Sequence, residues 1–167
     1  IMKDGSLLLE FEDMEYDTGC LALITDPDAC GEKAIKTTAS GFLWEADEPK
    51  VKPTMKSKIV VDKEGTYTFW IRTKSTNTTN YITTYTDLGN IGTSKTVTLR
   101  YDVVGDYKWD KLGTQRLTEG VNTICMKYRS HNAIYDKLII TSNTGFQPVE
   151  KDDSPFDEVG SDLEVNL

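Results

Sequence analysis

Hydrophobic and polar residues alternate along most of this chain with a period of two, which is the period of β-strands. The stretch "TYTFWIRT" (Thr66–Thr73) places Tyr67, Phe69 and Ile71 on one face and polar residues, with Trp70, on the other. Seven further segments are rich in β-branched and aromatic residues and are predicted to be strands: Leu7–Glu12, Lys56–Val61, Asn80–Thr86, Lys95–Tyr101, Tyr107–Leu112, Val121–Tyr128 and Tyr135–Thr141.

Turn-forming residues separate these segments, as in "DKEG", "LGNIG", "VVGD", "TEG" and "SHN". We find no helical period and no internal repeat. Short strands separated by regular turns predict an all-β fold, an antiparallel β-sandwich of jelly-roll type. Beyond Pro148 the chain becomes acidic and loses its alternation, so we predict a sandwich over residues 1–149 and an acidic linker or tail over residues 150–167.

The net charge of −8 argues against nucleic acid as a partner, because phosphate binding depends on clustered Lys and Arg. No apolar run approaches the roughly 18 residues of a membrane helix, so we expect no membrane span. The opening residues "IMKDGSLLLEF" lack the features of a signal peptide, and the sequence is expected to be an excised module. Cys20 and Cys30 could form a small disulfide loop or remain thiols, whereas Cys125 is expected in the core.

Known catalytic motifs are missing from the sequence. It has one histidine, His131, and neither a nucleophile elbow nor a P-loop nor a zinc-protease motif. Carboxylate pairs could cleave glycosides, but none stands out by its spacing. "DPDACG" (Asp26–Gly31) lacks the later ligands of an EF-hand and is expected to be a polar turn. We therefore predict that the chain is not an enzyme.

Three carboxylates suggest a metal site instead. In an extended strand, Glu10 and Glu12 point to the same side while Phe11 faces the other way. Two such close charges repel unless a cation lies between them, and their oxygens suit Ca²⁺. Asp136 lies where the last predicted strand turns apolar, and the first and last strands commonly meet in such sandwiches. Solvated surface positions are the alternative for all three.

Five segments follow one another along the chain: "LLLEFEDMEY", "GEKAIKTTASGF", "KEGTYTFWIRT", "YKWDKLGTQRLTEGVNTICMKY" and "AIYDKLIITSN". In this order they resemble the carbohydrate-binding modules of families 6 and 35 from bacteria. The resemblance spans about residues 7 to 148. It implies a structural calcium held by Glu10, Glu12 and Asp136, with a backbone carbonyl near Glu32 or Lys33.

The resemblance also implies a sugar site in loops at one end of the sandwich. The matching aromatic residues are Trp44, with Phe42 nearby, and Tyr107 or Trp109. Tyr107 and Trp109 are two positions apart and share a face of the predicted strand. They could form a stacking platform for a sugar or a buried pair, and for Trp109 we favour a position in the core. Polar partners for a sugar would be Arg129, His131 and Asn132.

Two departures from the family pattern lie in these ligand-contacting loops: the long insertion "GFLWEADEPKVKPTMK" and the spacing of "YKW". The ligand therefore stays open. We expect a non-catalytic, monomeric carbohydrate-binding module that targets a parent extracellular bacterial protein to a polysaccharide. The alternative is a structural or protein-interaction spacer in a cell-surface or multi-enzyme assembly, in which these aromatic rings would be buried.

Overall fold

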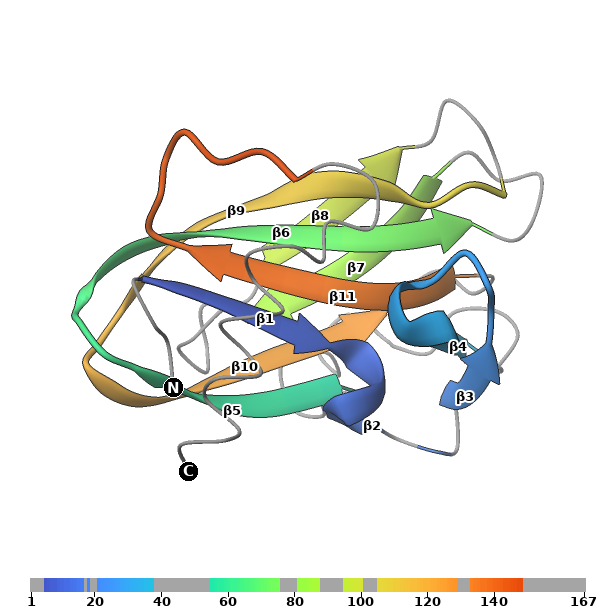
Figure 1. Cartoon of the computed structure of the whole chain (residues 1–167), viewed down its shortest axis with the longest axis horizontal. Coiled ribbons are helices and arrows are strands. Elements are labelled where there is room, and N and C mark those ends of the chain that lie inside the picture. Colours follow the sequence, from blue (N-terminus) through green and yellow to red (C-terminus); the bar gives the residue numbers. More distant parts are fainter. Residues whose placement is uncertain are drawn as a thin grey trace.

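Two antiparallel β-sheets face each other in the computed structural model, which describes residues 5–16, 18, 21–37, 55–75, 81–87, 95–100, 105–128 and 133–148 (Figure 1). Within these residues the first sheet contains β1 (Ser6–Glu10), β3 (Leu21–Thr25), β4 (Lys33–Thr37), β6 (Gly65–Ser75), β9 (Lys108–Leu117) and β11 (Ala133–Thr141). The second contains β2 (Glu15–Tyr16), β5 (Met55–Val61), β7 (Tyr81–Asp87), β8 (Lys95–Arg100) and β10 (Gly120–Tyr128).

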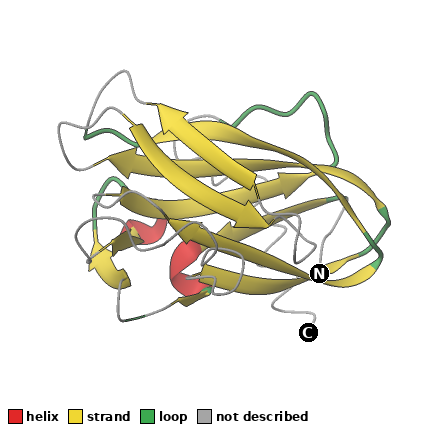
Figure 2. Cartoon of the chain, turned by 180° about the vertical axis from the view of Figure 1, so that it is seen from behind, coloured by secondary structure: helices red, strands yellow, loops and turns green. Residues whose placement is uncertain are grey.

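Strands distant in sequence are neighbours in both sheets. The order is β3-β4-β11-β6-β9 in the first sheet, with β1 also paired to β11, and β2-β5-β10-β7-β8 in the second. The view from behind shows strands dominating the fold, with two short red helical turns (Figure 2). These are the 3-10 turns η1 (Phe11–Asp13) and η2 (Cys30–Glu32). The predicted jelly-roll β-sandwich is confirmed.

One side of β11 is shared by two strands placed end to end. β1 pairs with the later half of β11, ending at Glu10 opposite Lys137, and β4 pairs with Ile134 and Tyr135 (Figure 1). Between these two partners, at Asp136, the pairing of β11 with β6 on its other side is also interrupted by a shift in register. Such a bulge redirects a side chain and locally releases it from the strand alternation.

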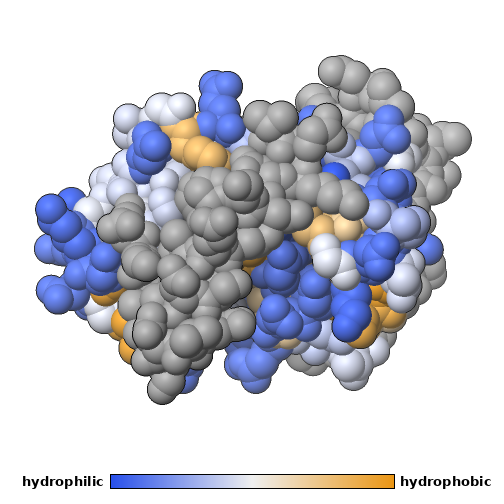
Figure 3. Space-filling view, viewed as in Figure 1, coloured by the Kyte–Doolittle hydropathy of each residue, from blue (hydrophilic) through white to orange (hydrophobic). Residues whose placement is uncertain are grey.

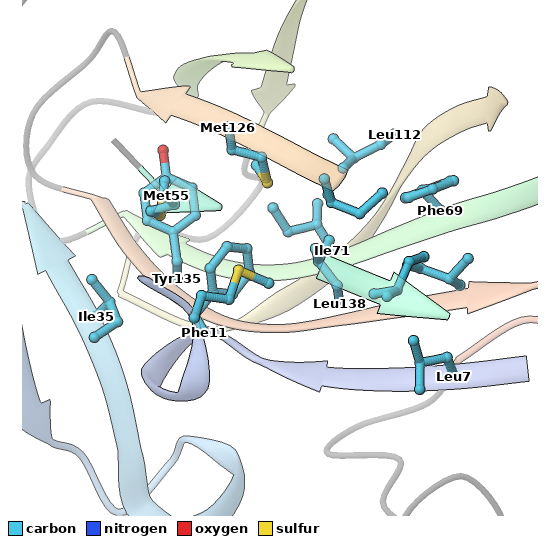
Figure 4. Packing of buried hydrophobic residues seen from close by; sticks show 14 of the residues in the cluster. Leu7, Phe11, Ile35, Met55, Phe69, Ile71, Leu112, Met126, Tyr135 and Leu138 are labelled. Atoms are coloured by element: carbon cyan, nitrogen blue, oxygen red, sulfur yellow. The ribbon is translucent and has the colours of Figure 1, made fainter. Parts of the chain in front are cut away.

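The core lies between the two sheets and takes buried side chains from both, among them residues of β6 in the first sheet and of β5 in the second. Tyr67, Phe69 and Ile71 of β6 are buried in it, as the alternation predicts. Figure 4 shows Phe69 and Ile71 among the packed side chains. The η1 turn directs Phe11 toward Tyr135 of β11, and their ring centroids are 5.4 Å apart. The first and last strands are therefore joined by aromatic packing as well as by backbone pairing.

The other face of the first sheet, which we call its outer face, is partly buried. Thr68 and Arg72 of β6 are polar residues buried there. On the face shown in Figure 3, hydrophilic residues predominate and hydrophobic ones form small separate patches. Exposed large hydrophobic residues in the described part of the chain are Leu23, Val60 and Val121.

Several predicted boundaries need correction. The first strand ends at Glu10 rather than Glu12, because the chain turns into η1, and β9 continues to Leu117 instead of Leu112. β2, β3 and β4 were not predicted, since they are short and their alternation is weak. The proposed domain boundary at residue 149 and the acidic tail lie outside the described residues. No helix in the described ranges is long and apolar enough to cross a membrane.

Candidate functional site

The outer face of the first sheet carries a row of four residues in register, and this row organises the candidate site. Glu10 lies opposite Lys137, Lys137 opposite Arg72, and Arg72 opposite Trp109, on β1, β11, β6 and β9. Directly opposed residues of neighbouring strands share a face of the sheet. The row therefore joins the predicted metal ligand Glu10 to the predicted aromatic residue Trp109.

Asp136 is fully buried and accepts hydrogen bonds from two sides. Its Oδ2 lies 2.6 Å from Nη1 of Arg72, and the backbone N–H of Cys30 lies 3.1 and 3.2 Å from its two carboxylate oxygens. A buried carboxylate requires such partners, because desolvation otherwise makes its charge very costly. At the bulge, the Asp136 side chain reaches both Cys30 of η2 and Arg72 of β6.

Glu10 and Glu12 lie beside this pair but are less well satisfied. One oxygen of Glu10 lies 3.3 Å from Nζ of Lys137, whose side chain is fully buried. Within the described part of the chain, Oε2 of each glutamate is buried without a hydrogen-bond partner. The chain turns at η1 between the two glutamates, so they do not share a strand face as predicted, but the charge of Glu12 still acts on Glu10.

The electrostatics of this acid cluster, defined as Glu10, Glu12, Asp136 and Lys137, disfavour its negative charges. Burial raises the pKa of Glu10 to about 8, despite the favourable charge of Lys137, and Glu12 and Asp136 raise it further. Burial likewise raises the pKa of Glu12 to about 7. An additional cation would relieve both costs.

The donor atoms of the acid cluster suit calcium in part. The two unsatisfied glutamate oxygens are hard ligands of the kind Ca²⁺ takes, and Oε1 of Glu12 faces η2, 3.9 Å from where a Cβ on Gly31 would lie. The described residues contain no three acid, His or Cys side chains grouped closely enough to hold a metal by themselves. A calcium here would thus need backbone carbonyls or water in addition to the carboxylates.

A second cluster surrounds Tyr107, just before β9. Its hydroxyl donates to Oδ2 of Asp26 at 3.0 Å, and Lys74 Nζ lies 2.5 Å from the same oxygen. The Arg72 guanidinium and the Lys74 ammonium lie 4.4 and 4.6 Å from the centre of the tyrosine ring, at cation–π distance. Burial, and then the bond to Asp26, raise the pKa of the Tyr107 hydroxyl.

This second cluster fastens the loop Asp26–Glu32 to the sheet. Arg72 also donates to the carbonyl of Asp28 at 3.1 Å, and the N–H of Asp28 bonds to the carboxylate of Asp26 at 3.0 Å. Burial alone would raise the pKa of Asp26, but the bonds from Lys74, Asp28 and Tyr107 outweigh it and lower the value. The polar turn predicted for "DPDACG" is confirmed as a turn, although its role in fastening the loop was missed.

The predicted sugar-binding residues divide into two groups. Tyr107 and Trp109 are both half-buried. Trp109 lies on the outer face, opposite Arg72, and outside the main hydrophobic cluster, so the favoured core position for it was wrong. The other predicted residues lie outside the described residues: Trp44, Arg129, His131 and Asn132. The same holds for Cys20, so its pairing with the buried Cys30 stays a prediction.

Sequence reasoning missed four charged residues of the two clusters: Asp26, Arg72, Lys74 and Lys137. Arg72 and Lys74 are two apart in a clear strand pattern, and that spacing would have placed both on the face opposite Phe69 and Ile71. Lys137 directly follows Asp136, but only the bulge explains how both reach the same cluster. The ion pairs that these residues form within the described part of the chain join positions 48 to 127 apart, a separation over which sequence pattern says little.

Comparison with solved structures finds the same fold in carbohydrate-binding modules. A family 35 carbohydrate-binding module from Clostridium thermocellum matches 81% of this chain and 98% of its own length, with a TM-score of 0.62 and 16% identity. Module CBM6cm-2 of Cellvibrio mixtus lichenase 5A, solved with cellotriose, matches 85% of this chain and 99% of its own, with a TM-score of 0.59 and 13% identity.

A third match is part of an enzyme. The GH26-CBM35 β-(1,4)-mannanase of Podospora anserina matches 87% of this chain, with a TM-score of 0.65 and 17% identity, but the match covers only 29% of the mannanase. No protein-family model matches the sequence, and no curated protein matches it. The chain therefore has the fold of family 6 and 35 carbohydrate-binding modules, and the resemblance is confirmed at the level of the fold.

Proposed function

We propose that this chain is a non-catalytic carbohydrate-binding module that holds a parent protein close to a polysaccharide. The observation that carries the proposal is the match to two such modules along nearly their whole lengths. Half-buried Tyr107 and Trp109 at one end of the sheet add rings of the kind that stack on pyranose faces. Attachment would raise the local concentration of the substrate for a linked catalytic domain.

The partners and location follow from the same proposal. A linked glycoside hydrolase or scaffold is supported by the mannanase, of which the matching part is only 29%. We infer that the chain works outside the cell, as a monomer, in a bacterial protein. Trp44, Arg129, His131 and Asn132 remain proposed contacts of the sugar.

Affinity electrophoresis against a panel of soluble polysaccharides tests the carbohydrate proposal. At least one glycan should retard the protein, with a dissociation constant of roughly micromolar to millimolar. Trp109→Ala and Trp44→Ala should each reduce the retardation, because they remove stacking area. Val121→Ala, a change to an exposed residue of the second sheet, is the matched control and should migrate as the wild type does. Absence of retardation by every glycan would refute the proposal.

The alternative is a structural or protein-interaction spacer, and one observation favours it. The ring and hydroxyl of Tyr107 already have partners in Arg72, Lys74 and Asp26, so this residue has an internal role. If the wild type binds a glycan and Trp109→Ala and Trp44→Ala bind it equally well, the aromatic sugar site is excluded. If the wild type binds no glycan at all, the spacer becomes the better proposal.

We also infer that the acid cluster holds a structural calcium, with Glu10 and Glu12 as ligands and Asp136 contributing an oxygen while it keeps its bond to Arg72. A carboxylate has enough lone pairs to do both. The two unsatisfied buried oxygens support this inference. Calcium should raise the melting temperature of the wild type, and the double variant Glu10→Gln, Glu12→Gln should lose that response.

A further inference from the structure

Lys137 is a fully buried lysine whose ammonium lies within the acid cluster. Its Nζ is 3.3 Å from Oε1 of Glu10, and the two residues are directly opposed on β11 and β1. Lysine is almost never fully buried unless its charge is compensated. The position of Lys137 is therefore tied to the neighbouring carboxylates.

The charges of the cluster and its neighbour can be counted. Glu10, Glu12 and Asp136 would contribute three negative charges when ionised, while Lys137 and Arg72 contribute two positive charges. Arg72 is engaged by Asp136 at 2.6 Å, and among the described residues Lys137 is the cation in contact with Glu10. A calcium ion bound to Glu10 would bring two further positive charges close to the lysine ammonium.

We propose that Lys137 is a built-in counter-cation of the acid cluster, and that calcium must compete with it for Glu10. This inference rests on the calcium site proposed above and is independent of carbohydrate binding. With Lys137 in place, the carboxylates retain a positive partner when calcium is absent. The stability of the junction between β1 and β11 then depends only partly on calcium. The calcium affinity of the site is lower than the acid ligands would give without the lysine.

Like-charge repulsion supplies the physical reason. Two cations within a few ångströms of the same carboxylate oppose each other strongly in a partly buried site, where screening by water is weak. Either the ammonium withdraws from Glu10 when calcium binds, or calcium binds weakly. Both cases predict that neutralising Lys137 strengthens calcium binding.

The experiment is calorimetric titration of the calcium-free protein with CaCl₂, combined with thermal unfolding in EDTA and in calcium. Lys137→Met removes the charge and keeps most of the side-chain volume. Lys111→Met is the matched control, because Lys111 is an exposed lysine on the outer face of the same sheet, opposite Trp70. Lys137→Arg keeps the charge and tests whether charge alone is responsible.

We expect Lys137→Met to bind calcium about ten-fold more tightly than the wild type, as ligand charge tunes such sites. Its melting temperature should fall in EDTA and recover in calcium, so that calcium stabilises the variant more than the wild type. Lys111→Met and Lys137→Arg should bind calcium within about two-fold of the wild type, since neither removes charge from the cluster.

Two results would overturn the inference. In the first, Lys137→Met lowers the melting temperature equally with and without calcium, and its calcium affinity equals that of the wild type. Lys137 would then act only by packing. The other is an absence of calcium binding in Lys137→Met. Should this variant fail to fold in both buffers, Lys137→Gln carries the same two criteria. Retardation by glycans is measured separately, so failure here and failure of the carbohydrate proposal are distinguished.

Discussion

The carboxylate of Asp136 lies 2.6 Å from Nη1 of Arg72, and both side chains are almost completely buried. This ion pair joins the bulge of β11 to β6 and, through the carbonyl of Asp28, to the loop before β4. It therefore links the acid cluster, to which Asp136 belongs, to the cluster around Tyr107. The proposed calcium site and the proposed sugar contact of Tyr107 both depend on this ion pair.

Asp136→Asn should be strongly destabilising, because it leaves the Arg72 charge buried without its partner. Losses of this kind are roughly 3–5 kcal/mol in the free energy of unfolding. Urea denaturation followed by tryptophan fluorescence measures the change. Asp110→Asn is the matched control, since the Asp110–Lys108 pair is partly exposed and should cost no more than about 1 kcal/mol. Equal effects would mean that burial of the Asp136 pair has no special importance.

Tyr107→Phe should destabilise the protein by about 1 kcal/mol, because it removes the hydrogen bond to Asp26 and keeps the ring beside Arg72 and Lys74. Tyr107→Ala should cost more, since the ring contacts disappear as well. If sugar stacks on the ring, glycan retardation should survive in Tyr107→Phe and weaken in Tyr107→Ala. Equal glycan retardation in both would remove Tyr107 from the sugar site.

The calcium-free protein should lose stability as the pH rises from about 5 to 8. The pKa values of Glu10 and Glu12 are raised from 4.5 to about 8 and about 7, so the folded chain binds protons that the unfolded chain has already released. Unfolding then releases protons, and stability falls with rising pH across this window. Thermal unfolding in metal-free buffers should show the decline.

Excess calcium should flatten this pH dependence, because a bound cation keeps both carboxylates ionised in the folded state. The double variant Glu10→Gln, Glu12→Gln should show little dependence in either buffer. A wild-type profile that rises with pH in the absence of calcium would contradict the assigned burial of the two carboxyl groups.

Gly31→Ala should destabilise the protein by about 1 kcal/mol. Gly31 has a φ of 65°, a left-handed conformation that strains any residue with a Cβ. Space itself is not limiting, since the added Cβ would be 3.9 Å from Oε1 of Glu12. Chemical denaturation measures the cost. A neutral result would mean that the turn relaxes to an ordinary conformation when alanine replaces the glycine.

The sequence alone determined the class of fold and the inward face of its best strand. Alternation with a period of two is a local property of the chain, so Tyr67, Phe69 and Ile71 could be assigned to the core before any partner was known. Short strands such as Glu15–Tyr16 were missed, because two residues carry no measurable period and pairing across the sheet decides their conformation.

The tertiary structure decided how the acidic residues of the candidate site come together. Sequence pattern singled out Glu10, Glu12 and Asp136, but it assigned the glutamates to one strand and could not foresee η1, the bulge or the burial of Lys137. Register between β1 and β11 joins residues 127 positions apart. Such pairing depends on the packing of the whole sandwich, which no local pattern encodes.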